Sequence, residues 1–416
     1  MTVTDSWPMV DSSTTAKQTA NHLRKLVEGS KDVFETEESN LPVINMSIGD
    51  PTIFGNFKTH PLVLEATIEQ FQSYKYNGYN NSTGLTSARA AIAKEYSEPE
   101  HSVNFTQNDV FVTCGCSGAV EISISSLCSP GDNILIPKPG FPLYKSCAES
   151  RGVAYKQYNL LPSEGWKVDL NNLESLIDNR TKAILVNNPS NPCGSNWDKQ
   201  HIQEILDICD RHKIPLISDE IYNGLIFSGE TFFSAASISK RVPILTLGGL
   251  AKRYMMPGWR VGWITVHDPL HVMTTVKEGI TELCGLLLGP SAPIQAAIPK
   301  IFEGTFNAEY TKQNCDQLEA NANAIFQGIS TIRGLTPILP RGAMYLMVLV
   351  DPSLFDQHLS SGIEIFKNLM HEEHVQILPG EAFDFMNSFR IVITPPKDKL
   401  VEAISRINTF CNRHYI

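Results

Sequence analysis

The stretch "PILTLGGLAKRYMMPGWRVGW", residues 243–263, holds an apolar strand, a turn and the start of a second strand. The first predicted strand covers Pro243–Leu247, and two glycines after it open a turn that carries Lys252. A Pro-Gly step then stops any helix and turns the chain back into a strand that begins at Arg260. In an open α/β sheet, ligands bind beyond the carboxyl ends of the strands. Lys252 and Arg260 are therefore candidates for a ligand site.

Short apolar strands alternate with helical stretches on both sides of this segment, from about residue 40 to residue 300. The predicted strands are Asp109–Thr113, Asn133–Pro137, Lys182–Val186, Pro215–Ser218, Pro243–Leu247 and Arg260–Val266. The predicted helices between them are Ala119–Leu127, Pro142–Ser150 and Lys199–His212. Strands that alternate with helices indicate a parallel sheet, and hence an α/β fold.

The chain after about residue 300 follows a different pattern, which is typical of an α+β domain. A predicted helix at 308–332 leads into the strand "RGAMYLMVLV", residues 341–350. A helix at 363–373, the strand "FRIVIT" at 389–394 and a closing helix follow. We therefore expect three parts. They are an N-terminal arm at 1–45, a large domain at 46–300 and a small C-terminal domain at 301–416.

The composition of the 416 residues is that of a folded protein, with 42% hydrophobic and 19% charged residues. A net charge of −10, without any run of five Lys or Arg, argues against nucleic-acid binding. No apolar stretch approaches the roughly 18 residues of a membrane span, and the polar N-terminal stretch lacks the apolar core of a signal peptide. The nine cysteines form no CxxC pair and no Cys/His cluster with zinc spacing. We expect reduced thiols, no metal and a cytoplasmic protein.

The residues that follow the other predicted strands are also of types that bind ligands. "CGCSGA", residues 114–119, offers backbone N–H groups at a helix start, which can hold a phosphate. Phe141 in "KPGFPLY" could lie on a flat ring, and Asn191 in "NNPSNPCG" could donate a hydrogen bond. Asp219 and Tyr222 in "DEIY" could face the same cleft. Each feature alone is at least as well explained by a turn or a packed core residue, so the inference depends on their combination.

Pyridoxal phosphate is a cofactor that uses this whole combination. It needs a lysine for its Schiff base, an anion site for its phosphate and a carboxylate for its pyridinium nitrogen. Lys252 provides the amine nucleophile, and Asp219 would keep the ring nitrogen protonated. Asn191 and Tyr222 can both reach the phenolic oxygen of the ring. We therefore expect Lys252, Asp219 and Tyr222 to be the catalytic residues of a pyridoxal-phosphate enzyme.

Four motifs of the chain resemble those of the fold-type I, class I/II pyridoxal-phosphate-dependent aminotransferases. They are "NPSNPCG", "SDEIY", "GGLAKRYMMPGWRVGW" and "PRGAMYL". Within that family, "SIGDPTIFGN" and "TANHLRKLVE" are similar to the tyrosine aminotransferase branch. The resemblance extends from about residue 19 to the C-terminus. It implies a large domain with a mostly parallel seven-stranded sheet and a smaller α+β domain.

The resemblance also implies which residues bind the substrate. Lys252 would move the proton between the substrate α-carbon and the cofactor. Arg390 in "SFRIVIT" would bind the substrate carboxylate with its planar guanidinium group. Gly49 would approach the same carboxylate through its backbone, and Asn191 would contact the substrate as well.

A second set of residues is implied to bind the cofactor. Phe141 would stack on its ring, and Cys116, Ser117 and Arg260 would hold its phosphate. Tyr79 in "YNGYNNSTG" would reach the phosphate of the neighbouring subunit. The resemblance therefore implies a homodimer with shared active sites.

The implied reaction is a ping-pong transamination in aromatic amino acid catabolism. An aromatic L-amino acid (tyrosine, phenylalanine or tryptophan) would give its amino group to 2-oxoglutarate, pyruvate or oxaloacetate. An alanine-type aminotransferase, a C–S lyase or a cyclopropane-forming synthase on the same fold would need the same Lys252 and Asp219. A non-catalytic protein that binds pyridoxal phosphate is disfavoured, because Lys252, Asp219, Tyr222 and Arg390 are all present. No arginine is marked by a motif as the partner of a side-chain carboxylate, so the acceptor stays open.

Overall fold

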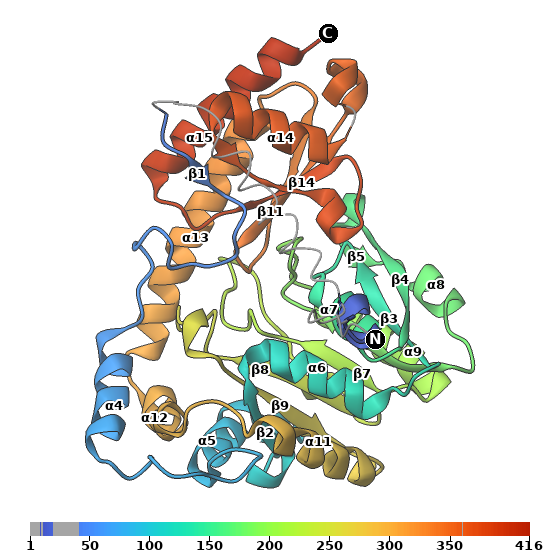
Figure 1. Ribbon diagram of the computed structural model, residues 1–416, viewed down its shortest axis with the longest axis vertical. Coiled ribbons are helices and arrows are strands. Elements are labelled where there is room, and N and C mark those ends of the chain that lie inside the picture. Colours follow the sequence, from blue (N-terminus) through green and yellow to red (C-terminus); the bar gives the residue numbers. More distant parts are fainter. Residues whose placement is uncertain (1–8, 10, 20–40, 360) are drawn as a thin grey trace, which may run out of the picture.

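The computed structural model describes residues 9, 11–19, 41–359 and 361–416. Most of the predicted N-terminal arm lies outside the described residues, apart from the short helix α1 (Thr14–Gln18). The chain has an α/β fold with two main sheets, one in the lower and one in the upper half of Figure 1. No helix within these ranges is both long enough and apolar enough to span a membrane.

The large sheet has eight strands in the order β2-β9-β8-β7-β6-β3-β4-β5. They are β2 (Val110–Cys114), β9 (Val261–His267), β8 (Ile244–Gly249), β7 (Leu216–Asp219), β6 (Thr181–Asn187), β3 (Asn133–Lys138), β4 (Ala154–Leu161) and β5 (Lys167–Val168). The five consecutive strands β8, β7, β6, β3 and β4 pair in parallel. The strand β9 is antiparallel to its neighbours β2 and β8, and β5 is antiparallel to β4. The seven strands from β2 to β4 in this order form the expected mostly parallel sheet, and β5 extends it at the β4 edge. The additional strand, β5, has two residues and is too short to show a periodic pattern.

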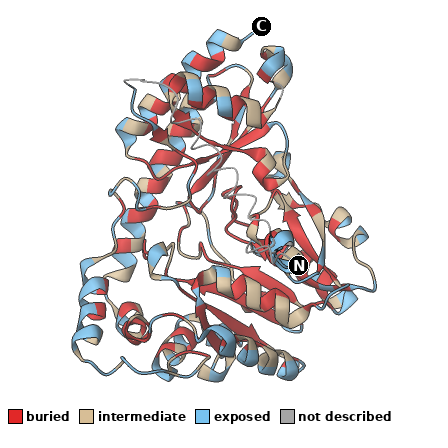
Figure 2. Cartoon of the chain, in the orientation of Figure 1, coloured by how far each residue is buried: buried red, intermediate tan, exposed pale blue. Residues whose placement is uncertain are grey.

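Helices cover both faces of the large sheet because successive residues of its central strands point to opposite sides. Leu216 of β7 belongs to the core on one face, and Ile217 belongs to the core on the other. The first face is covered by α8 (Leu170–Ser175), α9 (Lys199–His212) and α10 (Ala235–Ile238). The second face is covered by α6 (Gly115–Leu127), α7 (Leu143–Ser150) and α11 (Thr274–Leu287). Figure 2 shows the result: the strands are buried almost throughout, and the helices present buried and exposed residues in alternation.

The small sheet has four antiparallel strands in the order β10-β11-β14-β13. They are β10 (Leu335–Ile338), β11 (Tyr345–Val350), β14 (Ser388–Val392) and β13 (Leu378–Pro379). The helices α13 (Asn307–Ile329), α14 (Gly362–Glu373) and α15 (Lys397–His414) pack with it in the upper half of Figure 1. In the pairing of β11 with β14, Met347 lies opposite Arg390. This is the α+β pattern predicted for the C-terminal part.

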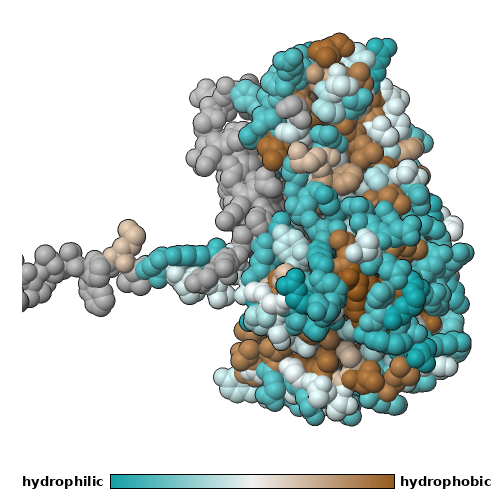
Figure 3. Space-filling model, turned by 90° about the vertical axis from the view of Figure 1, so that its right-hand side faces the viewer, coloured by the Kyte–Doolittle hydropathy of each residue, from teal (hydrophilic) through white to brown (hydrophobic). Residues whose placement is uncertain are grey.

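The helix α12 (Ala292–Glu303) packs against both α4 (Pro61–Gln72) and α5 (Thr86–Tyr96), and α5 packs against β2. One hydrophobic core joins them to α13 and the small sheet, through residues such as Ile92, Ile298, Leu318 and Val348. The predicted domain boundary near residue 300 stays a prediction, because this core is continuous across it. On the side of the molecule shown in Figure 3, hydrophilic side chains surround smaller groups of apolar ones.

A short segment from residue 44 to residue 50 connects to the small C-terminal part. Its first two residues form β1 (Ile44–Asn45), which pairs in parallel with β12 (Val375–Gln376). The N–H of Met46 donates to the carbonyl of Gln376 at 2.7 Å, and the carbonyl of Met46 accepts from the N–H of Val392 at 2.9 Å. These bonds fix the backbone that continues directly into the cavity.

Candidate active site

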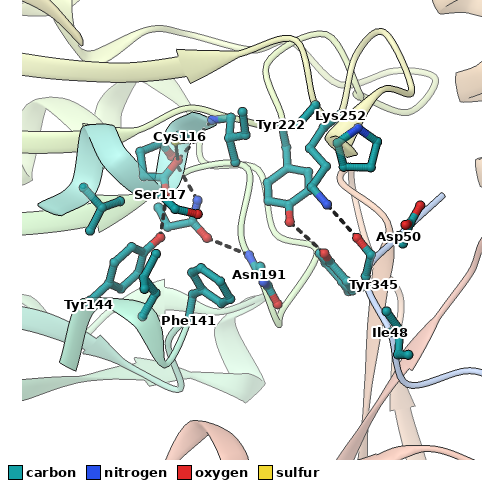
Figure 4. A pocket seen from close by; sticks show the side chains of 18 of the residues that line it. Ile48, Asp50, Cys116, Ser117, Phe141, Tyr144, Asn191, Tyr222, Lys252 and Tyr345 are labelled. Carbon is teal, nitrogen blue, oxygen red and sulfur yellow. Dashed lines mark hydrogen bonds between the residues drawn. The ribbon is translucent and has the colours of Figure 1, made fainter. Parts of the chain in front are cut away.

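A cavity of about 550 Å³ lies between the carboxyl ends of the large-sheet strands and the small sheet (Figure 4). All of the predicted site residues except Tyr79 line it. They are Gly49, Cys116, Ser117, Phe141, Asn191, Asp219, Tyr222, Lys252, Arg260 and Arg390. The structure therefore brings together residues that lie far apart in the sequence.

Lys252 lies in the turn that follows β8, and its Nζ donates to the carbonyl oxygen of Gly49 at 2.6 Å. The glycines before the lysine are required by close packing. A Cβ at Gly248 would lie 2.4 Å from Nε1 of Trp263. Gly248 and Gly249 are the last two residues of β8, where the Trp263 side chain of β9 lies close to the strand, and the lysine side chain of the following turn lines the cavity.

Asp219 is the last residue of β7, and its side chain is 3% exposed. The hydroxyl of Tyr144 donates to Oδ2 at 2.7 Å, and the backbone N–H of Ile221 donates to Oδ1 at 3.2 Å. Burial raises the pKa of Asp219, and these hydrogen bonds act against the rise. Asp219 forms no ion pair with the described part of the chain. A buried carboxylate of this kind is costly to ionise unless a cation faces it.

The N-terminus of α6 and Arg260 together form a site suited to an anion. Cys116 and Ser117 lie in the first turn of α6, where the backbone N–H groups carry partial positive charge. Gly115 has φ +69°, and a Cβ there would lie 2.6 Å from Nη2 of Arg260. Only glycine at this position admits the guanidinium to the helix end. A helix N-terminus beside an arginine is well suited to a phosphate.

Tyr222 and Asn191 also line the cavity (Figure 4). The hydroxyl of Tyr222 lies 2.7 Å from the hydroxyl of Tyr345. Burial raises the pKa of Tyr222 well above its usual range, and the neighbouring Tyr345 raises it further, so the hydroxyl stays protonated. The backbone N–H of Asn191 donates to Oδ1 of Asn187 at 2.7 Å, which fixes the Asn-Pro turn at the end of β6.

Arg390 lies in the middle of β14 and is 2% exposed. Its Nη1 donates to Oδ1 of Asn191 at 2.8 Å, and its Nη2 donates to the carbonyl of Ser47. The guanidinium carbon lies 4.4 Å from the ring centre of Tyr345 and 5.1 Å from that of Phe383. Burial lowers the pKa of Arg390, and its Nε is buried without a hydrogen-bond partner. Within the described ranges no carboxylate pairs with it, so this buried cation is available to an anion.

The cavity therefore has a buried carboxylate on its large-sheet side and a buried guanidinium on its small-sheet side. A ligand with a cationic group at one end and a carboxylate at the other would satisfy both. Lys252 offers an amine in the same cavity, and α6 with Arg260 offers a phosphate site. These residues fit pyridoxal phosphate together with an amino acid, as predicted.

Tyr79 does not line the cavity, and its side chain is 96% exposed. It lies in the connection between α4 and α5. Its predicted role involves a second subunit, which a single chain does not contain. That role therefore stays a prediction.

Several further residues line the cavity without a role assigned from the sequence, among them Tyr144, Asn187 and Tyr345. Asn187 ends β6 and Tyr144 lies in the first turn of α7, so both follow the strand-end rule that identified their neighbours. Tyr345 lies within the "PRGAMYL" motif but begins a strand of the other sheet. Its contact with Tyr222 joins positions 123 residues apart, which no local pattern contains.

Comparisons with known proteins agree with this geometry. The family described as aminotransferase class I and II matches residues 42–407. Tyrosine aminotransferase of Mus musculus is 42% identical over 401 residues, which cover 96% of this chain and 87% of the mouse protein. The tyrosine aminotransferase of Dictyostelium discoideum is 40% identical over 409 residues and 97% of each chain. The crystal structure of tyrosine aminotransferase from Leishmania infantum superimposes with a TM-score of 0.94 at 35% identity, over 99% of this chain and 100% of that one.

Proposed function

The chain belongs to the class I and II aminotransferase family, and from that premise we propose that it moves the amino group of an aromatic L-amino acid to a 2-oxo acid, with pyridoxal 5′-phosphate as cofactor. The observation that carries the proposal is the pair of buried, uncompensated charges of Asp219 and Arg390 in one cavity with Lys252. The donors would be tyrosine, phenylalanine or tryptophan. The acceptors would be 2-oxoglutarate, pyruvate or oxaloacetate.

The chemistry that the bound cofactor supplies is withdrawal of electrons from the substrate α-carbon, so that a proton can leave it. Asp219 would hold a positive charge at the ring nitrogen, because a cation offsets the cost of ionising this buried carboxylate. The first turn of α6, with Cys116 and Ser117, would bind the phosphate together with Arg260.

Lys252 would move the proton between the substrate α-carbon and the cofactor, carrying it on Nζ. In the structure, a hydrogen bond to the carbonyl of Gly49 holds that amine in the cavity. Tyr222 would donate a hydrogen bond to the ring oxygen, since its hydroxyl stays protonated. Phe141, which packs edge-on to Tyr144 at 5.7 Å, would cover one face of the ring.

Arg390 would bind the carboxylate that the amino acid and the oxo acid have in common, with two N–H groups in one plane. A ping-pong reaction requires such a shared contact, because the two substrates occupy the site in turn. Besides Lys252, Arg260 and Arg390, the described lining of the cavity has no cation for a second carboxylate. The choice between pyruvate and the dicarboxylic acceptors therefore needs to be measured.

A panel of amino donors and acceptors tests the proposal. The purified holoenzyme is given tyrosine, phenylalanine, tryptophan or alanine, each with pyruvate, 2-oxoglutarate or oxaloacetate, and both products are quantified. We expect the highest kcat/KM with an aromatic donor. A clear preference for alanine would establish the alanine-type alternative instead. Release of pyruvate and ammonia from a cysteine conjugate without any acceptor would indicate the C–S lyase alternative.

We also propose a homodimer in which Tyr79 reaches the phosphate site of the partner subunit. The exposed position of Tyr79 is compatible with contact to a second chain. Nearby on α4, Leu64, Ile68 and Phe71 are spaced to share one helix face and are 46%, 48% and 51% exposed. Closed two-fold dimers are the commonest oligomers, and such an apolar face suits one.

Mixed dimers test the shared site. One parent carries Lys252→Ala, and the other carries Tyr79→Glu. Each homodimer is expected to be nearly inactive, but a mixed dimer would contain one site with the intact Lys252 of one chain and the intact Tyr79 of the other. Activity should therefore return when the parents exchange subunits. If exchange is demonstrated by mass spectrometry and no activity returns, the shared site is wrong.

The cytoplasmic location is likewise a proposal. All nine cysteines are free thiols in the structure. Reduced cysteines are typical of proteins kept in a reducing compartment. Fractionation of cells with an antibody to the protein would test the location directly, and recovery with an organelle fraction would contradict it.

A further inference from the structure

We infer that Tyr345 is a positioning residue that holds both Arg390 and Tyr222, so that substrate carboxylate binding and the hydrogen bond at the cofactor ring depend on one side chain. The inference rests on the proposed function, in which Arg390 contacts the substrate and Tyr222 the cofactor. Tyr345 begins β11 and is 1% exposed. It touches the two residues with different parts of its side chain.

The ring of Tyr345 supports the guanidinium of Arg390. The two groups are 4.4 Å apart, closer than the 5.1 Å to the ring of Phe383 on the same guanidinium. Arg390 also donates to Asn191 and Ser47, but its Nε has no hydrogen-bond partner. A cation over an aromatic face is stabilised more strongly when both are removed from water. The ring of Tyr345 therefore helps to fix the plane in which Arg390 can bind a carboxylate.

The hydroxyl of Tyr345 holds the hydroxyl of Tyr222. The two oxygens are 2.7 Å apart, and the rings meet edge-to-face with centres 5.6 Å apart. The Tyr345 hydroxyl also packs closely against the backbone of Gly49. A Cβ added at Gly49 would lie only 2.4 Å from the hydroxyl oxygen. The carbonyl of Gly49 in turn accepts the bond from Lys252. Tyr345 thus contacts the backbone segment that holds Lys252 as well as the residue that would contact the ring oxygen.

Two substitutions separate the two contacts of Tyr345. Tyr345→Phe keeps the ring under Arg390 and removes only the hydroxyl. Tyr345→Leu removes both the aromatic face and the hydroxyl. The pairing of Tyr345 with Val392 in the sheet uses the backbone, so both variants keep the β11–β14 register. Leucine and phenylalanine are both well accommodated in a buried strand.

The test uses the holoenzyme and two readouts besides turnover. The probe for the carboxylate site is 3-(4-hydroxyphenyl)propanoate, which has no amino group to transfer, and its Kd is measured by calorimetry. The probe for Tyr222 is the visible absorption of the bound cofactor at one fixed pH. For Tyr345→Phe we expect a Kd within about twofold of wild type, because the aromatic face remains. Its absorption should change, and kcat should fall by about threefold to tenfold, as for a lost hydrogen bond.

For Tyr345→Leu we expect the same change in absorption and, in addition, a Kd raised by about thirtyfold, the size of a desolvated cation–π contact. Tyr158→Phe is the matched control. Tyr158 is also fully buried, and its hydroxyl donates to the carbonyl of Leu185 at 2.8 Å, but it does not line the cavity. We expect it to change neither readout, whatever it does to stability.

Arg390→Lys distinguishes failure of the inference from failure of the proposed function. If Arg390→Lys leaves the Kd unchanged, the proposed carboxylate contact is wrong, and so is the inference. If Arg390→Lys weakens binding but Tyr345→Leu does not, only the role of the Tyr345 ring is overturned. Should Tyr345→Leu fail to fold, Tyr345→Phe decides the role of the hydroxyl: wild-type absorption and kcat would overturn it.

Discussion

The two sides of the cavity are built in different ways. On the large-sheet side, the key residues follow strand ends: Asp219 ends β7 and Lys252 lies just after β8. On the small-sheet side, Tyr345 is the first residue of β11 and Arg390 is the middle residue of β14. Parallel strands place their carboxyl ends at one edge, where successive turns meet. An antiparallel strand instead presents alternate side chains along its whole length, so a binding residue can stand anywhere in it.

The two sides also differ in charge. The large-sheet side presents the buried carboxylate of Asp219, and the small-sheet side presents the buried guanidinium of Arg390. This difference gives the cavity a direction, because a ligand with a cationic and an anionic end fits only one way round. Substitutions on the two sides should therefore have different kinetic consequences.

Lys252→Ala should have the largest effect, because it removes the proposed nucleophile of the large-sheet side. We expect turnover to fall to background and the visible absorption of the lysine-bound cofactor to disappear. Cofactor should still be retained in part, since the phosphate site at α6 is untouched. Turnover, absorption and cofactor content after gel filtration measure these effects. Lys277→Ala, which removes a lysine paired with Asp109 away from the cavity, is the control. Wild-type turnover in Lys252→Ala would overturn the assignment.

Asp219→Asn should have the next largest effect. It keeps the shape of the side chain but removes the negative charge that we propose faces the ring nitrogen. We expect kcat to fall by about a thousandfold, on the order of 4 kcal/mol of activation free energy. Single-turnover kinetics with tyrosine measures this step. A loss below tenfold would show that another group carries the charge on this side of the cavity.

Arg390→Lys tests the small-sheet side. Lysine keeps the positive charge but cannot offer two N–H groups in one plane. We expect the affinities for the amino acid and for the oxo acid to fall together, by about tenfold to a hundredfold. KM for both substrates and the Kd of a non-reacting carboxylate measure this. A change confined to one substrate would mean that Arg390 contacts the side chain and not the shared carboxylate.

Glu220→Gln should have the smallest effect on activity, although Glu220 follows Asp219 directly. Its Oε1 accepts from Ser218, from Ser234 and from the backbone of Ala235, and it does not line the cavity. Burial raises the pKa of Glu220 from 4.5 to about 7. Because the pKa of Glu220 is higher in the folded state than in the unfolded state, protonation of this carboxyl group stabilises the folded protein. That contribution is fully present below pH 4.5 and is lost as the pH rises towards 7.

The pH dependence of stability checks this for Glu220. Between pH 5 and pH 8, ionisation of Glu220 should lower the free energy of unfolding of the wild type by on the order of 3 kcal/mol. The glutamine variant cannot ionise and should lack this loss, while its turnover stays unchanged. Urea unfolding at the two pH values measures the difference. If the free energy of unfolding changed equally with pH in both proteins, a raised pKa for Glu220 would be contradicted.

The large-sheet side could be predicted in detail from local sequence. The six predicted strands of this sheet agree with the observed ones to within two residues at each end. The start of α6 was placed too late, at Ala119 in place of Gly115. The reason is that the glycine-rich turn expected to precede the helix forms its first turn. Asp219 and Lys252 were found because short apolar strands with polar ends are visible in the sequence itself.

The small-sheet side was less accessible to such reasoning. Arg390 was assigned only through the resemblance to a family, although one local signal exists. It stands between Phe389 and Ile391 in an apolar strand, and a charged residue that is buried there needs a partner. Tyr345 was not found at all. An aromatic residue at the start of a strand is ordinary, and only the folded chain shows that it lies between Arg390 and Tyr222.

The bond from Arg390 to the carbonyl of Ser47 joins residues that are 343 positions apart. During translation, the segment at 44–50 leaves the ribosome long before β14 is made. At about 5–20 residues per second, that interval is roughly 20 to 70 s. Every strand of the large sheet lies before residue 268 and can form in the meantime, whereas β1 has to wait for β12. A nascent chain that stops before residue 390 therefore has Lys252 and Asp219 but no Arg390, and the site is completed only once β14 has been synthesised.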